Sequence, residues 1–300
     1  MHPALQRIVP PMTSTSHKGQ SGRIGVFGGS SDYTGAPYFS AISALRVGAD
    51  LSYVLTADSA AQVIKGYDPE LMVTPVYQTE WQDDEEAARK GADSMSRQVV
   101  SYFSRLHCLV VGPGIGRHTM MLEAMKLVLT CAKDDQLPVH PELAKGNPHV
   151  TLTPNVVEFV RLWTAAGFDE SDLPKTDSGS FAPSLDNVKQ LASAFGGVTV
   201  VMKGASDHIS DGKEAVTCDL KGGLKRCGGL GDILSGTLGT FLAWNSLEEK
   251  RSGEQAKDGG SQEQTASYQA YAKHGRSMGA QDVIAQLASV IEELAPAPRL

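Results

Sequence analysis

The sequence has no apolar run of the roughly 20 residues that a membrane-spanning helix needs, so we expect no membrane contact. Its four cysteines include no CxxC pair, which favours a reduced, intracellular protein over a zinc site or a disulfide framework. The formal net charge of −7 argues against binding to nucleic acid or anionic membranes. Residues 1–20 contain no apolar h-region, so we expect no secretory signal and a cytoplasmic location, with a mitochondrial form as the alternative.

The two common nucleotide-binding fingerprints are also missing. Gly25, Gly28 and Gly29 do not have the G-x-G-x-x-G spacing of a dinucleotide-binding turn. Residues 223–228 have the glycine spacing of a P-loop, but Gly229 stands where that motif has its lysine. A Rossmann dehydrogenase and a P-loop enzyme are therefore both disfavoured.

The chain does contain enough apolar residues for a full core. With 300 residues, of which 41% are hydrophobic, it fits one large domain or two small ones, and we expect one. Predicted strands alternate with predicted helices, and this pattern indicates an α/β fold with a mostly parallel sheet covered on both faces. In such sheets, ligands bind at the carboxyl ends of the strands. The predicted strands are 23–27, 51–56, 108–111, 150–153 and 198–202, and the predicted helices are 37–47 and 120–133.

Several segments are interpreted as peripheral. Residues 1–21 are expected to form a tail, and residues 22–300 a single domain. Residues 164–185 and 246–267 are polar, lack periodicity and are expected to be solvent loops or poorly ordered linkers. The acidic run at 83–86 is predicted to open a helix, where negative charge is favourable.

The segment Gly228-Gly229-Leu230-Gly231-Asp232 is the strongest candidate for chemistry. Its glycines allow the main-chain N–H groups to surround an anion, and the apolar run after it predicts a buried helix whose positive end faces that anion. A carboxylate beside a phosphate site suits a base that deprotonates an attacking hydroxyl. Asp232 is therefore the first catalytic candidate, and the alternative is that it only caps the helix.

Other polar loops follow the predicted strands and are grouped with this segment. Lys203 follows the strand at 198–202 and could bind a phosphate as a point charge. Asn155 and Glu158 follow Pro154 at a helix start, where capping alone would also explain them. Lys225 and Arg226 precede the glycine turn and are either phosphate partners or solvated residues.

Taken together, these segments resemble the ATP-dependent NAD(P)H-hydrate dehydratases of the ribokinase-like superfamily, from about Gly22 to Leu287. The individual motifs are weak, but their number and order make the combined resemblance specific. The matching segments are 28–30, 33–37, 110–117, 152–159, 203–204, 228–232 and 273–277.

The resemblance implies a ribokinase-like three-layer α/β/α fold and an enzyme that repairs hydrated NADH and NADPH (NADHX and NADPHX) with ATP and Mg²⁺. Asp232 would deprotonate the hydroxyl of the hydrate, which ATP phosphorylates before phosphate leaves. Metal ligands and homo-oligomerisation stay open, and a separate NAD(P)H-hydrate epimerase is the implied functional partner. Hydrate contacts are implied for Gly114, Gly116, Asn155, Val156, Val157, Glu158, Phe159, Val160, Arg161 and Asp232. Nucleotide contacts are implied for Lys203, Gly204, Ala205, Ser206, Asp207, Gly222, Gly223, Leu224, Lys225, Arg226, Cys227, Gly228, Gly229, Leu230 and Gly231.

The chain departs from the family pattern in one region. The family has a full strand and an Asp-Ala-Asp-Gly-like loop after the helix at 120–133, whereas residues 137–149 contain only a short apolar stretch between prolines. We therefore expect that one central strand is lacking, as in a shortened splice form or gene model. Two alternatives follow: a ribokinase-like kinase of a vitamin precursor, since the same turn and Asp232 would serve it, or a nucleotide-binding protein inactivated by the shortening.

Overall fold

The structure is a computed structural model that describes residues 7–78, 85–116, 121, 124–125, 127–128, 146–147, 149–252, 269, 272–273 and 278–294. The chain forms two compact units. The first unit contains residues 1–122 and 221–300, and the second contains residues 123–220. A single catalytic domain over residues 22–300 stays a prediction.

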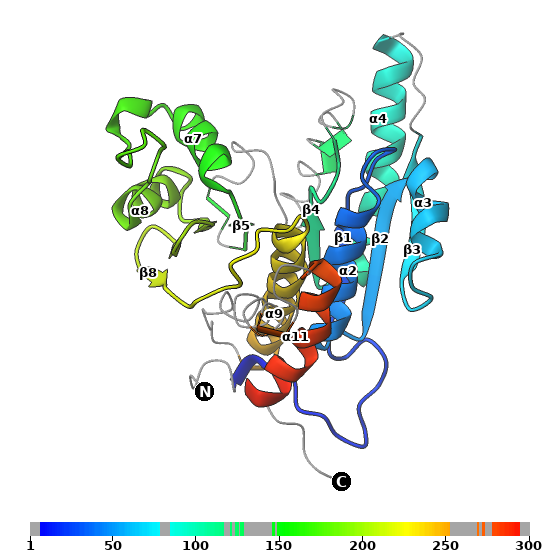
Figure 1. Ribbon diagram of the computed structural model, residues 1–300. Helices are drawn as coiled ribbons and strands as arrows, with labels where there is room; N and C mark the ends of the chain where they lie inside the picture. Colours follow the sequence, from blue (N-terminus) through cyan, green and yellow to red (C-terminus); the bar gives the residue numbers. More distant parts are fainter. Residues whose placement is uncertain are drawn as a thin grey trace. The chain divides into compact units, whose positions relative to one another are not determined.

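A parallel sheet forms the centre of the first unit (Figure 1). Its strands lie in the order β3-β2-β1-β4, and each neighbouring pair is parallel. The strands expected at 23–27 and 108–111 are confirmed, and the strand expected at 51–56 extends by one residue on the carboxyl side. The strands are β1 (Arg23–Phe27), β2 (Leu51–Ala57), β3 (Met72–Tyr77) and β4 (Cys108–Val111).

Helices α2 and α9 pack side by side against this sheet (Figure 1). Ile24 and Cys108 of the sheet form one buried cluster with Ala44 of α2 and Ala243 of α9. Helix α11 packs against α2, α3 connects β2 to β3, and α4 and a short 3₁₀ turn precede β4. The helices are α2 (Gly35–Val47), α3 (Asp58–Lys65), α4 (Glu85–Val100), η1 (Phe103–Arg105), α9 (Leu230–Ser252) and α11 (Ala280–Leu294).

The second unit has a mixed sheet in the order β5-β6-β7-β8. Strands β5 and β6 are parallel, and the other neighbours are antiparallel. Helices α7 and α8 contribute Phe159, Trp163, Val188 and Leu191 to its hydrophobic core. The elements are β5 (Thr151–Leu152), α7 (Val156–Ala165), η2 (Glu170–Asp172), α8 (Leu185–Ala194), β6 (Thr199–Met202), β7 (Asp207–Ser210) and β8 (Ala215–Cys218).

The segment 164–185 is attached to this core at several points. The Trp163 indole N–H donates to the main-chain oxygen of Asp169 at 2.8 Å, and the Phe168 ring lies 4.4 Å from the Trp163 ring. Leu173 is buried in the same cluster. The expectation of a solvent loop or poorly ordered linker, which rested on the polar composition, is therefore wrong for the part of this segment that contacts the core through Phe168, Asp169 and Leu173.

The segment 246–252 is helical, so the expectation of a solvent loop is wrong for these residues. Helix α9 continues to Ser252. Arg251 pairs with the buried carboxylate of Glu248, and the Asn245 amide donates to Glu249 at 2.7 Å. Side-chain pairs three and four residues apart stabilise the last turns although the apolar pattern has ended. Residues 253–267 lie outside the described part of the chain.

Two further expectations fall mainly on residues that are not described. Of the helix expected at 120–133, the described residues 121, 124–125 and 127–128 are helical. Of the shortened stretch 137–149, only residues 146–147 and 149 are described. The described residues between β4 and β5 contain no strand. The lack of a central strand therefore stays a prediction.

The segment before β1 is anchored to the first unit. The Asp50 carboxylate accepts hydrogen bonds from the Gly19 and Ser21 N–H groups, both at 2.8 Å. The Trp244 indole donates to the Ser21 carbonyl at 2.6 Å, and Ile8 is only 3% exposed. The segment expected as a tail is therefore held on the first unit through Ile8, Gly19 and Ser21.

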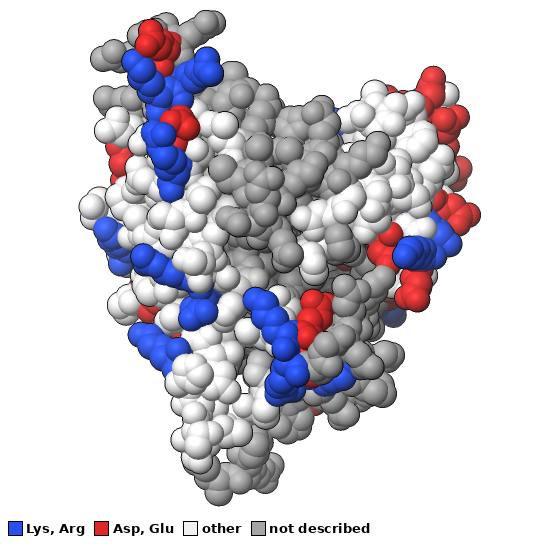
Figure 2. All heavy atoms as spheres, turned by 180° about the vertical axis from the view of Figure 1, so that it is seen from behind, with Lys and Arg blue, Asp and Glu red and all other residues white. Residues whose placement is uncertain are grey.

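Charged residues on the surface are mixed in sign. On the face drawn in Figure 2, Lys and Arg lie in several separate groups instead of one continuous field. Helix α4 shows the pattern locally, with Lys90 beside Glu86 at 2.8 Å and Arg97 beside Asp93 at 2.7 Å. Such one-turn pairs leave little net charge along the helix. None of the described helices is long and apolar enough to cross a membrane.

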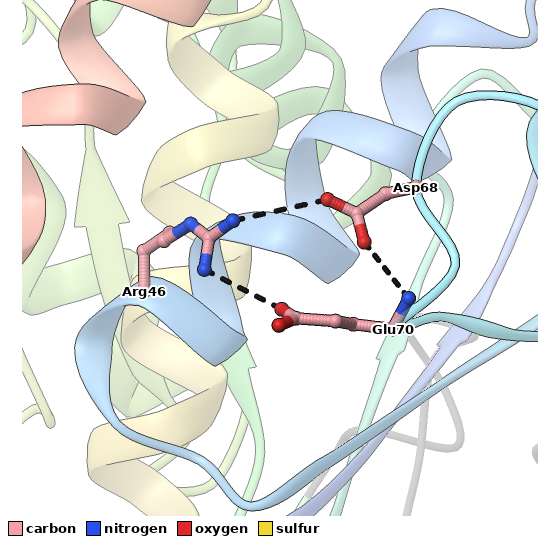
Figure 3. A network of polar contacts seen from close by, with 3 residues as sticks. All are labelled: Arg46, Asp68 and Glu70. Carbon is pink, nitrogen blue, oxygen red and sulfur yellow. Dashed lines mark hydrogen bonds and ion pairs between the residues drawn. The ribbon is translucent and has the colours of Figure 1, made fainter.

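An ion-pair network links α2 to the loop before β3 (Figure 3). Arg46 lies 3.8 Å from Asp68 and 3.4 Å from Glu70, and the Glu70 N–H donates to the Asp68 carboxylate at 2.8 Å. We expect Arg46→Ala to lower the free energy of unfolding by no more than about 1 kcal/mol, because the guanidinium is exposed and screened by solvent. Urea denaturation at low and high salt measures this. A loss that does not shrink at high salt would contradict the electrostatic explanation.

His107 makes the stability of the first unit depend on pH. Its Nδ1 accepts the Arg23 N–H at 3.2 Å, and its Nε2 lies 2.9 Å from the Arg23 guanidinium. Burial, and then the positive charges of Arg23 and Lys250, lower the pKa of His107 from 6.5 to about 4. Between these two values the unfolded chain binds a proton that the folded chain does not, so the free energy of unfolding falls as the pH falls through this window.

The expected loss from pH 7 to pH 4 is on the order of 1–2 kcal/mol for this group, after a discount for its partial exposure. Urea denaturation over this pH range measures it. His107→Gln removes the titrating group and should flatten this part of the profile. If the free energy of unfolding has the same slope against pH in wild type and in His107→Gln, His107 is not the group that causes the pH dependence.

Candidate active site

The start of α9 requires glycine at its first turn. Gly229 has φ +95°, a conformation that favours glycine, and it immediately precedes the helix. A β-carbon at this position would lie 2.7 Å from the Phe39 ring and 3.0 Å from Ala280. Gly229 therefore allows the turn to lie directly against α2 and α11.

The first N–H groups of α9 are available to a ligand. The Ile233 N–H donates to the Gly229 carbonyl at 2.9 Å, which begins the helical ladder. Among the described residues, no hydrogen bond is made by the N–H groups of Leu230 and Gly231. Unpaired N–H groups at the positive end of a helix favour an anion. The expected role of this turn in phosphate binding stays a prediction.

Asp232 lies in the first turn of α9 beside these N–H groups. The residue is half-buried at this helix start. The Ser235 hydroxyl donates to the Asp232 main-chain carbonyl at 2.7 Å, which fixes the backbone of this turn. Because Gly229 directly precedes the helix and accepts its first hydrogen bond, Asp232 is the third helical residue and does not occupy the N-cap position. A carboxylate here stabilises the positive end of the helix, and its role as a base stays a prediction.

The close approach of α2 fixes where α9 begins. A β-carbon on Gly236 would lie 1.9 Å from the Ser40 carbonyl oxygen, so the two backbones nearly touch. The Ser40 and Ser235 hydroxyls lie 3.0 Å apart, and the Thr240 hydroxyl donates to the Ala44 carbonyl at 3.3 Å. Small residues on α9 therefore let the helices pack at short range, and this holds the first turn of α9 in place.

The loops after β1 and β4 are joined to each other. The Gly29 N–H donates to the Pro113 carbonyl at 2.8 Å, and a β-carbon on Gly28 would lie 2.1 Å from that same oxygen. Gly114 has φ +63° and approaches Tyr33 so closely that a β-carbon would lie 2.9 Å from the tyrosine Cβ. Two glycine loops at the carboxyl ends of neighbouring parallel strands therefore form one surface.

Tyr77, at the end of β3, is hydrogen-bonded to the loop after β1. Its buried hydroxyl donates to the Gly29 carbonyl. Burial raises the pKa of Tyr77 well above its usual range. The phenol therefore keeps its proton at any physiological pH and remains a donor to the loop.

In the second unit, the expected capping box at the start of α7 is confirmed. The Asn155 side chain accepts the Glu158 N–H at 2.9 Å, and the Glu158 carboxylate accepts the Asn155 N–H at 2.8 Å. Phe159 is fully buried in the core and Val160 nearly so, whereas Val157 is 62% exposed. A ligand contact by Phe159 or Val160 would have to use the main chain, because their side chains are packed against the core.

The loop after β6 lies beside this helix start. The Lys203 N–H donates to the Pro154 carbonyl at 2.9 Å, so the carboxyl ends of β5 and β6 bring these two loops together. The Asp207 carboxylate turns back to accept the Gly204 N–H at 2.8 Å and is 9% exposed. Asp207 therefore shapes the turn. The Lys203 ammonium has no ion-pair partner among the described residues, so it can bind an anion.

The expected site residues 222–228 lie on the segment before α9. Leu224 is 81% exposed, and Arg226 is exposed as well. Lys225 and Arg226 form no ion pair with any described residue. Of the expected motif at 273–277, only Lys273 is described. Within the described ranges, no three His, Cys, Asp or Glu residues come together as metal ligands.

Two residues of this surface were missed by the sequence reasoning. Phe39 packs on Gly229, and Ser40 meets α9 at Gly236. Both lie in an apolar helix whose pattern gives no hint of which residue faces the turn, so no signal in the sequence could have identified them. Tyr33 had a signal, since it lies within the segment 33–37 that carries the resemblance.

Comparison with known proteins identifies the family to which the sequence is similar. Residues 24–289 match the sequence profile of a family described as NAD(P)H-hydrate dehydratase. A Neurospora crassa protein named ATP-dependent (S)-NAD(P)H-hydrate dehydratase is 41% identical over 316 residues, which cover 93% of this chain and 89% of that protein. The human protein of the same name is 41% identical over 315 residues, covering 97% of this chain and 83% of the human one. Since these alignments are longer than the 300 residues of this chain, both relatives carry residues that have no counterpart here.

Solved structures support the fold. A ribokinase-like superfamily protein from Enterococcus faecalis superposes with a TM-score of 0.66 at 20% identity, covering 97% of this chain and 94% of that chain. An ADP/ATP-dependent NAD(P)H-hydrate dehydratase from Bacillus subtilis, co-crystallised with ATP and Mg²⁺, superposes with a TM-score of 0.62 at 18% identity. That superposition covers 96% of this chain and 95% of the bacterial one. At such identities the similarity establishes a ribokinase-like fold.

Proposed function

Because the chain belongs to the NAD(P)H-hydrate dehydratase family, we propose that it restores NADH and NADPH from their hydrates, NADHX and NADPHX, at the expense of ATP. The products are the reduced nucleotide, ADP and phosphate. One structural observation supports the proposal most directly: a carboxylate, Asp232, stands in the first turn of α9 beside main-chain N–H groups that have no hydrogen-bond partner among the described residues.

The proposed reaction solves a leaving-group problem. Hydroxide leaves the hydrated ring poorly, whereas phosphate leaves readily. Asp232 accepts the proton of the hydrate hydroxyl. At the same time, the hydroxyl oxygen bonds to the γ-phosphorus of ATP, and the bond between the γ-phosphorus and the leaving ADP oxygen breaks. Phosphate then leaves with its bonding electrons, the neighbouring ring carbon gives up a proton, and the double bond returns.

The N–H groups of Leu230 and Gly231 have the proposed task of binding the transferred phosphoryl group. Charge spreads over its oxygens in the transition state, and donors already fixed by a helix start need no reorganisation to bind them. Because Gly229 fits the space beside Phe39, the donors keep this arrangement before substrate arrives. The glycine turn is thus assigned to catalysis as well as to binding.

Residues of the second unit have proposed roles of their own. Lys203 is assigned to a phosphate of ATP, since its ammonium carries a charge without an ion-pair partner among the described residues. The start of α7 is assigned to the hydrate, with Val157 as its exposed apolar contact. The Asn155–Glu158 capping box has the supporting task of holding that helix start rigid.

Mg²⁺ fits this proposal as a companion of ATP. Mg²⁺ usually keeps several waters and binds through substrate phosphates with one or two carboxylates, so it does not need a cage of protein ligands. When bound, it would neutralise charge on the β- and γ-phosphates. We further propose that the protein acts in the cytoplasm beside a separate NAD(P)H-hydrate epimerase.

The deciding experiment mixes the protein, NADHX, ATP and Mg²⁺, and follows the absorbance of reduced nicotinamide together with phosphate release. We expect both to rise in equal amounts and only with ATP present. A phosphorylated hydrate that accumulates would identify a kinase instead, an alternative that the family match does not favour. Binding of ATP in calorimetry without consumption of NADHX would identify a nucleotide-binding protein that has lost the activity.

A further inference from the structure

An exposed aromatic side chain lies beside the loop that follows β4. Tyr33 is 57% exposed, and its ring makes no aromatic contact with any described residue. Its hydroxyl forms no hydrogen bond there either. Tyr67 lies close to the residue after Tyr33 but has partners for both its hydroxyl and its ring. Its hydroxyl lies 2.8 Å from that of Thr34, and its ring packs on Tyr38. More than half of Tyr33 is thus exposed, and its ring has no aromatic partner among the described residues.

The backbone that carries Tyr33 is fixed. The Ser30 and Tyr33 main chains exchange two hydrogen bonds, both at 3.2 Å. Gly29, just before this turn, is bound through its N–H to Pro113 and through its carbonyl to Tyr77. Helix α2 begins two residues after Tyr33. A ring held on such a frame loses little conformational freedom when it stacks on a ligand.

Tyr33 also lies directly against a residue with a proposed role in binding. A β-carbon on Gly114 would lie 2.9 Å from the Tyr33 Cβ and 3.0 Å from that of Ala36. Gly114 belongs to the segment assigned to the hydrate by the family resemblance. A hydrate that follows the loop 112–116 therefore passes within reach of the Tyr33 ring.

We propose that Tyr33 is a specificity-determining residue that stacks on the adenine ring of the hydrate; this inference rests on the proposed function. The hydrate has two nitrogen-containing ring systems, adenine and the hydrated nicotinamide. The hydrated nicotinamide ring contains tetrahedral carbons and is not flat. Adenine is flat and aromatic, so it offers the better surface for stacking on a phenol ring. Tyr33 then secures the far end of the hydrate and takes no part in the chemical step.

The test compares wild type, Tyr33→Ala and Tyr33→Phe with two substrates. One is NADHX, and the other is the hydrate of reduced nicotinamide mononucleotide, which lacks the adenine. We expect Tyr33→Ala to raise the KM for NADHX about tenfold and to leave kcat within about twofold, because stacking contributes to binding alone. Tyr33→Phe keeps the ring and should restore the KM. For the mononucleotide hydrate, and for ATP, the KM should be the same in all three proteins.

Three results would overturn the inference. They are an unchanged KM for NADHX in Tyr33→Ala, an equal rise for the mononucleotide hydrate, and a rise in the KM for ATP instead. Melting temperatures of the three proteins separate these results from misfolding. If the wild type does not convert NADHX at all, the proposed function fails. Calorimetric binding of NADHX to wild type and Tyr33→Ala then still decides whether Tyr33 holds the adenine.

Discussion

Asp232→Asn is expected to lower kcat by about a thousandfold, which lies in the range that a general base contributes. Asparagine keeps the size of the side chain and leaves Gly229 before the helix unchanged, but it cannot take the proton of the hydrate hydroxyl. The N–H groups of Leu230 and Gly231 stay in place. We therefore expect ATP binding, measured by calorimetry, to remain within about threefold of wild type.

Asp282→Asn is the matched control for this substitution. Asp282 also lies in the first turn of a helix of the same unit, where it accepts the Gly279 N–H at 2.7 Å. Its replacement should cost some stability of α11 and leave turnover near that of wild type. Near-normal turnover of Asp232→Asn would remove this residue from the mechanism, and an equal loss in both variants would point to helix stability instead of base catalysis.

Gly236→Val is expected to destabilise the protein by about 3 kcal/mol or more, as overpacking does when the atoms in the way cannot move. The first added carbon would lie 1.9 Å from the Ser40 carbonyl oxygen and 2.7 Å from its carbonyl carbon. These are backbone atoms of α2, so the clash is relieved only if α2 and α9 separate. Separation would also break the contact between the Ser40 and Ser235 hydroxyls.

Urea denaturation and thermal melting measure this effect. Gly222→Ala is the control, since a β-carbon there meets nothing within 4 Å and its φ is not in the left-handed region. It should melt within about 2 °C of wild type. A normal melting temperature for Gly236→Val would show that the two helices do not approach as closely as the structure indicates.

The regular part of the fold could be predicted from local sequence patterns. Apolar runs bounded by glycines identified β1 and β4, and the unit from β1 through α2 to β2 was expected within two residues at its ends. The end of α9 could not be predicted in this way. Its last turns are polar, and their stability comes from side-chain pairs such as Glu248 with Arg251, which an apolar pattern does not register.

The candidate site was predictable where chemistry and local geometry coincide. The glycine turn before α9 and the capping box of α7 follow from residue types at fixed short spacings, and the structure has both. Asp207 was expected near the nucleotide, and this stays a prediction; in the structure its carboxylate accepts the Gly204 N–H. The contacts of Phe39 with Gly229 and of Ser40 with Gly236 join residues about 190 positions apart, a separation that no local pattern encodes.

The anchoring of residues 7–21 affects how the protein should be produced. Cutting the chain just before β1 would leave the Asp50 carboxylate and the Trp244 indole without the partners that Gly19 and Ser21 supply. It would also uncover the surface on which Ile8 is buried. A shortened protein made for crystallisation or for assays would therefore start with a weakened α9, the helix that carries Asp232, and its low activity could be mistaken for a property of the enzyme.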